Sequence, residues 1–248
     1  MEVVNAMLEP RRLFFQIALS LTCTLTALAQ DVSRDVLRKE IQAKRGELAA
    51  LEKQFLAPAE TDRAQFGSLL SQPNTGLIRL LPREKFDGDV TKNEKTLTMR
   101  GGGAYYSFAR ATHEYGYGSD IGLYSGYLSV GFAGADYGML LKLGDISVED
   151  VSPELPAVHT LLEYTAATNE PDARIEQRRV STGVDFSGFL FKNRLPLETD
   201  TTYLLRSISY DTSDIAVTFR VVRKDTDGSA IIVFKVLKNF SVPKLARN

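Results

Sequence analysis

Apolar residues recur at alternating intervals of four and three residues near the start of the chain. Their positions are Leu37, Ile41, Leu48, Leu51 and Phe55, and the single polar member of the series is Lys44. This spacing places the side chains along one face of an α-helix. It predicts a helix over residues 31–57, which Pro58 follows. The helix either packs on its own domain or forms a coiled coil, in which case residues 34–55 associate with a second copy.

A weaker helical pattern at residues 60–71 precedes the sequence Gln-Pro-Asn-Thr-Gly at residues 72–76. Pro, Asn and Gly in close succession interrupt helices and strands. We therefore expect a domain boundary there. It separates a coiled-coil-like helical arm, residues 30–72, from a β-rich globular domain, residues 73–248.

The pattern beyond this boundary is that of short strands joined by turns that contain Gly, Asp or Ser. The expected strands are 77–81, 96–100, 105–110, 120–124, 127–132, 137–143, 203–210, 215–223 and 230–237. The last three form an antiparallel meander, and the final strand is apolar on both faces, so it is expected to be covered. Between the two groups of strands, the periodicity predicts helices and then further strand structure, at 153–166, 172–179 and 183–192. The expected fold class is α+β, a mainly antiparallel β body with a few helices, preceded by the helical arm.

Residues 1–29 have the pattern of a secretory signal peptide. Two arginines precede an uncharged run over residues 13–30, and Ala27 and Ala29 provide the small residues of a cleavage site. The run is short and polar for a membrane span, so cleavage is favoured over retention as an anchor. We expect an exported protein, periplasmic or extracellular, with no membrane span after cleavage.

The balance of residue types argues against several classes of function. The 248 residues carry a formal net charge of −1, which provides no basic field to attract nucleic acid. The one cysteine, Cys23, lies within the leader, so the cleaved chain has no disulfide, thiol nucleophile or cysteine metal site. Of the two histidines, His159 falls in an apolar helical pattern, which predicts a buried or half-buried packing role. No metal site, cofactor or catalytic residue is predicted.

One segment, residues 101–138, holds 10 of the 18 glycines and 7 of the 10 tyrosines. Aromatic, polar and titratable groups close together are typical of a ligand-binding site. The candidate residues in and beside this segment are Arg100, Tyr105, Arg110, His113, Glu114, Tyr117 and Asp120. The alternative interpretation is aromatic packing between strands that tight turns connect.

Two further motifs have structural explanations. The triplet Gly101-Gly102-Gly103 precedes a strand pattern, whereas a phosphate-binding loop precedes a helix. A β-bulge, a sharp bend or a close approach of two backbones is therefore favoured. The run Asp-Thr-Asp-Gly at residues 225–228 resembles part of a calcium loop, but a hairpin turn explains it.

The sequence favours a non-enzymatic interaction or scaffolding protein of the bacterial-type envelope. Its helical arm would self-associate or dock, and its tyrosine-bearing loops would contact an envelope partner. The alternative is a periplasmic hydrolase or small-ligand-binding protein with a site around His113, in which Ser107 or Ser119 would supply a nucleophile.

Overall fold

The computed structural model describes residues 10–89, 92 and 95–246. Side chains are described from residue 33 onward, so the predicted leader, residues 1–29, lies outside the residues whose side chains are described. Contacts divide the chain into two units, Met1–Leu51 and Glu52–Asn248, and each is considered by itself. Among the described residues, no helix combines the length and the apolar content that crossing a membrane requires.

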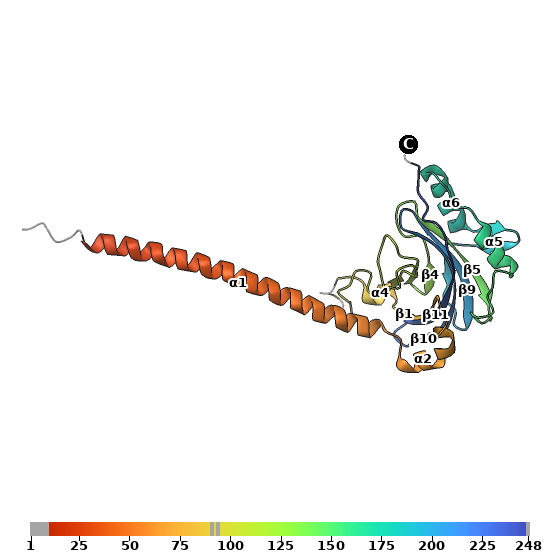
Figure 1. Cartoon of the computed structure of the whole chain (residues 1–248), viewed down its shortest axis with the longest axis horizontal. Helices are drawn as coiled ribbons and strands as arrows, with labels where there is room; N and C mark the ends of the chain where they lie inside the picture. Colours follow the sequence, from red (N-terminus) through yellow and green to blue (C-terminus); the bar gives the residue numbers. More distant parts are fainter. Residues whose placement is uncertain (1–9, 90–91, 93–94, 247–248) are drawn as a thin grey trace, which may run out of the picture. The chain divides into compact units, whose positions relative to one another are not determined.

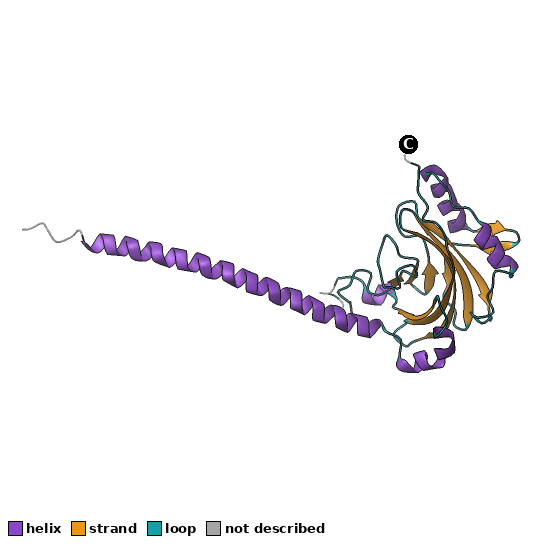
Figure 2. Cartoon of the chain, viewed as in Figure 1, coloured by secondary structure: helices purple, strands orange, loops and turns teal. Residues whose placement is uncertain are grey.

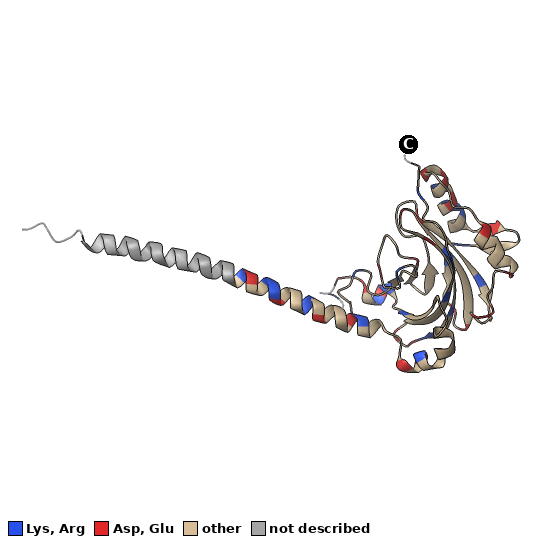
Figure 3. Ribbon diagram, in the orientation of Figure 1, with Lys and Arg blue, Asp and Glu red and all other residues tan. Residues whose placement is uncertain are grey.

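One helix, α1, forms the described part of the first unit. It runs from Pro10 to Leu56, which confirms the predicted helix from Ser33 onward. Its side chains at residues 33–51 are all exposed, and Figure 3 shows basic and acidic residues interspersed along this stretch. Neighbouring turns are joined by two ion pairs of 3.1 Å each, Arg38–Asp35 and Lys44–Glu47.

The described residues of the second unit form five further helices and three antiparallel sheets (Figure 2). The helices are α2 (Glu60–Gln65), α3 (Gly67–Leu70), α4 (Arg83–Phe86), α5 (Pro156–Glu163) and α6 (Glu170–Thr182). The five-stranded sheet has the order β1 (Thr75–Leu80), β11 (Ala230–Asn239), β10 (Ser213–Lys224), β9 (Thr201–Ser209) and β5 (Tyr137–Gly144). The four-stranded sheet has the order β2 (Tyr105–Tyr106), β3 (Ile121–Tyr124), β4 (Tyr127–Ser129) and β8 (Arg194–Pro196), and a hairpin pairs β6 (Val184–Phe186) with β7 (Phe189–Phe191).

This arrangement of helices and antiparallel strands confirms the predicted mixture of the two. The meander of β9, β10 and β11 is present, and in its register Phe219 lies opposite Tyr203 on one side and Phe234 on the other. Strand β11 is central, between β1 and β10, and its two faces are buried in different clusters, Ile232 in one and Ile231 in another, as predicted. The run at residues 225–228 is the turn between β10 and β11, as expected.

The strand predicted at residues 96–100 is wrong. The backbone N–H groups of Thr98 and Met99 donate to Oε1 of Glu52, at 2.9 and 3.2 Å. Glu52 is buried, and its carboxylate draws this loop toward the end of α1. Backbone donors that a carboxylate occupies are not available to a neighbouring strand.

The strand predicted at residues 105–110 ends early, at Tyr106. The N–H groups of Phe108 and Ala109 donate to Oδ2 of Asp120, at 2.7 and 3.2 Å. The carboxylate therefore turns the chain out of the sheet two residues after the strand begins.

Alternation along the strands gives the five-stranded sheet two apolar faces. One face receives the four-stranded sheet, whose Leu123 and Leu128 join Phe219 in one core cluster. The opposite face packs against α5 and α6 through Leu161 and Val180. Figure 1 shows α5 and α6 along one side of this curved sheet and β4 on the other.

Helices α2 and α3 also pack on the five-stranded sheet. Leu69 of α3 joins Leu77 and Ile231 in a third cluster, and Asp62 of α2 accepts a 2.9 Å hydrogen bond from Nη2 of Arg223. By its contacts, the segment at residues 60–71 therefore lies with the β-rich unit.

A buried ion pair joins β9, β10 and α5. Nε and Nη2 of Arg206 each lie 2.9 Å from a carboxylate oxygen of Asp214, and the two side chains are only 2% and 3% exposed. Nη1 donates to the backbone carbonyl groups of Leu161, at 3.0 Å, and of Tyr164. Carbonyl groups at the end of a helix lack intrahelical partners, so Arg206 caps α5. The guanidinium also lies 3.7 Å from the centre of the Phe240 ring.

We predict that Arg206→Ala destabilises the fold by about 3–5 kcal/mol, because it leaves Asp214 buried without a counter-charge. The matched control is Arg174→Ala, which removes the exposed pair of Arg174 and Glu170 on α6. That control is expected to cost less than about 0.5 kcal/mol. Urea denaturation measures both free energies of unfolding, and equal costs for the two variants would contradict the prediction.

Candidate functional site

The four-stranded sheet carries tyrosine and arginine on the face that points away from the core. Its register places Tyr105 opposite Gly122, and Tyr124 opposite Tyr127. Arg194 of β8 continues this face, with its guanidinium 4.1 Å from the centre of the Tyr127 ring. The alternate residues of the strands point into the core.

Arg83, the first residue of α4, lies at the centre of this face. Its guanidinium carbon is 5.7–6.0 Å from the ring centres of Tyr105, Tyr115 and Tyr124. Nη1 donates a 3.1 Å hydrogen bond to the Tyr105 hydroxyl, and Nε pairs with Asp87 at 2.9 Å. The hydrogen bond that Arg83 donates to Asp87 raises the pKa of Arg83 above its usual range. A guanidinium among aromatic rings is a stable arrangement because the ring faces attract cations.

Two more side chains complete this group. The Arg100 guanidinium lies 4.8 Å from the centre of the Tyr115 ring. The Phe132 ring meets Tyr105 edge-on at 5.0 Å. We call the set of Arg83, Arg100, Tyr105, Tyr115, Tyr124 and Phe132 the Arg83 cluster. Burial raises the pKa of the Tyr105 hydroxyl, which therefore remains protonated near neutral pH.

The three consecutive glycines allow this cluster to form. All three have positive φ angles, from 57° to 82°. A side chain at Gly102 would lie 2.2 Å from the backbone oxygen of Phe86, and one at Gly101 would meet the rings of Tyr115 and Tyr105. The predicted close approach of two backbones is confirmed, and it brings Arg100 beside α4.

The structure brings only some of the predicted candidates together. Arg100 and Tyr105 belong to the Arg83 cluster. Arg110 and Glu114 form an ion pair with each other on the adjoining loop. Tyr117, at the end of that loop, is 71% exposed.

His113 points into the molecule. Its Nε2 lies 2.8 Å from the backbone carbonyl oxygen of Arg79, so this nitrogen carries the proton. Its ring meets Tyr106 edge-on at 5.2 Å. Burial lowers the pKa of His113, which favours the neutral ring at pH 7. These contacts hold the 107–114 loop against β1.

Asp120 is fully buried, and its carboxylate accepts hydrogen bonds from the same loop. Burial raises its pKa, against the effect of its hydrogen bonds. The Ser107 hydroxyl is 3.3 Å from Asp120 Oδ2, and the Ser119 hydroxyl donates to the Glu114 carbonyl. The two serine hydroxyls thus bond to Asp120 and to the Glu114 carbonyl, whereas His113 bonds to the Arg79 carbonyl.

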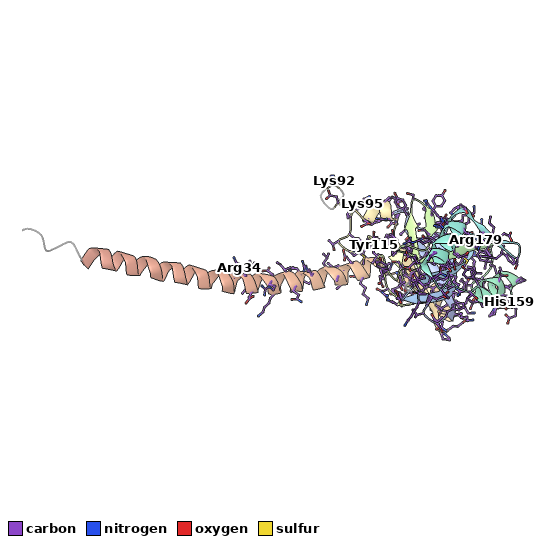
Figure 4. The ribbon with its side chains drawn as sticks, turned by 90° about the horizontal axis from the view of Figure 1, so that it is seen from above. Arg34, Lys92, Lys95, Tyr115, His159 and Arg179 are labelled. Carbon is purple, nitrogen blue, oxygen red and sulfur yellow. The ribbon has the colours of Figure 1, made fainter. Side chains whose placement is uncertain are left out.

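The predicted burial of His159 is wrong. Its side chain is 63% exposed and lies 3.3 Å from Glu163 on the same helix. The apolar face of α5 is formed by Ala157, Val158 and Leu161, and His159 lies outside it. Figure 4 shows His159 at the outer edge of the unit.

Three members of the Arg83 cluster were not predicted from the sequence, namely Arg83, Tyr124 and Phe132. One signal was available for Tyr124, because Ser125-Gly126 is a two-residue turn with φ angles of 48° and 75°. A turn of that length places the flanking residues directly opposite each other, here Tyr124 and Tyr127. Arg83 had no local signal, because it lies 22 residues before Tyr105.

A separate cavity of about 250 Å³ is lined by Asp136 with residues of α6, including Gln177 and Arg178. Oδ1 of Asp136 accepts the N–H of Tyr210 at 2.9 Å. Burial, with a smaller effect of nearby Asp211, raises the pKa of Asp136 to about 6. This cavity contains none of the candidate residues that the sequence suggested.

Within the described part of the chain, no group of three or more His, Cys, Asp or Glu residues is placed to hold a metal ion. Comparison of the chain with family models, curated proteins and solved structures finds no match. The geometry of the Arg83 cluster suits binding, through ring faces and guanidinium groups, more than proton transfer.

Asp136 predicts a pH dependence of stability. Its pKa is 3.8 when unfolded and about 6 when folded, so its stabilising contribution is complete below pH 3.8 and is lost as the pH rises through 6. Asp136→Asn keeps the acceptor for Tyr210 and should remove this loss, by roughly 1–3 kcal/mol at neutral pH. Urea denaturation at acidic and neutral pH measures it. The exposed substitution Asp150→Asn is the control, and a wild-type pH dependence in Asp136→Asn would contradict the prediction.

Proposed function

We propose that this chain is a non-enzymatic interaction protein of the cell envelope, exported from the cytoplasm. Residues 33–51 of α1 associate with a second copy, and the Arg83 cluster contacts an envelope partner. Export is supported by the leader pattern of residues 1–29. The lack of cysteine in residues 30–248 suits a bacterial envelope protein better than a eukaryotic secreted one.

The observation that carries this proposal is the exposed apolar stripe of α1. Leu37, Ile41, Leu48 and Leu51 are between 39% and 62% exposed, and each follows the last at heptad or half-heptad spacing. A row of exposed apolar side chains marks an interaction surface. Heptad spacing makes the stripe complementary to another helix with the same spacing, and a second copy of this chain carries such a helix.

The Arg83 cluster has the composition of a binding surface. Tyrosine and arginine are enriched at the centres of protein interfaces, where they bury large area at low conformational cost. Tyr124 and Tyr127 on this face are 48% and 41% exposed. The pairing of Arg83 with Asp87 and of Arg110 with Glu114 leaves this face with both charge signs, which favours a protein partner over nucleic acid.

Replacement of one residue in the stripe tests self-association. Ile41→Asp places a charge among the contacts between copies, and we expect it to weaken association about tenfold or more. Ala43→Asp introduces the same charge into the same helix, outside the stripe, and is expected to associate like the wild type. Sedimentation equilibrium of the full chain over a range of concentrations measures the association constants.

A monomeric wild type at all concentrations would contradict the proposal. Equal weakening by both substitutions would also contradict it, because the effect would then come from the stability of the helix.

A further inference from the structure

We propose that the self-associated helices run parallel and in register. This inference rests on the proposed function and adds the orientation of the second copy. It comes from the charges that border the apolar stripe. One border carries arginine and the other carries glutamate, namely Arg38 and Arg45 on the first side and Glu40 and Glu47 on the second. All four are exposed.

The two orientations bring different borders together. In a parallel pair, the second border of one helix faces the first border of its partner, five residues further along. Glu40 then meets Arg45 of the second copy, and Arg45 meets Glu40 in return. In an antiparallel pair each border faces its own kind, so Glu40 approaches Glu47 and Arg38 approaches Arg45. The parallel arrangement is attractive and the antiparallel one is repulsive.

One parallel contact needs separate treatment. The residue that would face Glu47 of the second copy is Glu52, a like charge. Glu52 is already buried within its own chain, where Oε1 accepts the N–H groups of Thr98 and Met99. The seam between copies therefore ends at Leu51, and the unfavourable contact is avoided.

In the parallel, in-register pair, Lys44 faces Lys44 of the second copy, and this like-charge contact costs stability. Lys44 is the polar member of the stripe, and its Nζ lies 3.1 Å from Glu47 on the same helix, which directs the charge toward the border. A polar residue in a coiled-coil seam selects a register at a cost in stability. A shift of one heptad would place Lys44 against Leu37 or Leu51, and only three of the five stripe positions 37, 41, 44, 48 and 51 would still face one another.

Charge reversal distinguishes the orientations. Arg45→Glu places Glu40 against a glutamate in the parallel pair, so we expect association to weaken about threefold to tenfold at low salt. In an antiparallel pair the same substitution would create an attraction to Arg38 and strengthen association. The double variant Glu40→Arg with Arg45→Glu should restore the wild-type affinity. Lys39→Glu, which lies outside both borders, is the control and should have little effect.

Disulfide cross-linking of cysteine variants distinguishes the two orientations directly. In the full chain with Cys23→Ser, Leu37→Cys should form disulfide-linked pairs with itself under mild oxidation. An antiparallel pair would instead link Leu37→Cys to Leu48→Cys when the two variants are mixed. Tighter association of Arg45→Glu, or linkage only in the mixture, would overturn the parallel arrangement while leaving self-association intact. A monomeric wild type would overturn the proposed function itself.

Discussion

The ion pair of Arg206 with Asp214 is the interaction on which the arrangement of the second unit depends. A guanidinium that is 2% exposed must have its donors satisfied within the protein. The acceptors come from the neighbouring strand β10 and from the last carbonyl groups of α5. The strand register of the meander and the position of α5 both provide acceptors for Arg206. A change in either would leave donors of this buried guanidinium unpaired. Helices cover this face of the five-stranded sheet, and the four-stranded sheet packs on the opposite face. Two residues of the four-stranded sheet, Tyr105 and Tyr124, belong to the Arg83 cluster.

Buried carboxylates play a similar part in the loops. Glu52, Asp120 and Asp136 each accept backbone N–H groups from a segment distant in the sequence. Each of these acids stabilises the loop or turn whose N–H groups it accepts, and Asp136 also lines the cavity beside α6. His113 likewise donates its ring N–H to the Arg79 carbonyl. These four side chains therefore have structural roles in the fold.

The sequence predicted well those features that depend on periodicity within a short window. The α1 helix and the β9–β11 meander both follow from the spacing of apolar residues. The prediction failed where a distant group decides the local conformation. Residues 96–100 do not form a strand because their N–H groups bond to Glu52, which lies more than forty residues earlier. The local sequence pattern does not indicate that acceptor. Arg83 was missed for the same reason, since its ring partners come from three other segments. The sharp change of chain direction at the glycine triplet could be predicted, because the residue type itself determines which backbone conformations are allowed.

The apolar stripe of α1 and the Arg83 cluster would reinforce each other in the proposed function. A cluster of a few tyrosines and arginines provides a small contact area, and small interfaces bind weakly as single sites. In the proposed parallel pair, Glu52 of each copy would lie at the same end of the paired helices, where the second unit of each chain begins. A second binding event would then occur at a high effective concentration, and the combined affinity would rise without any new contact. An antiparallel pair would place Glu52 of the two copies at opposite ends and would lose most of this gain for a partner on one surface.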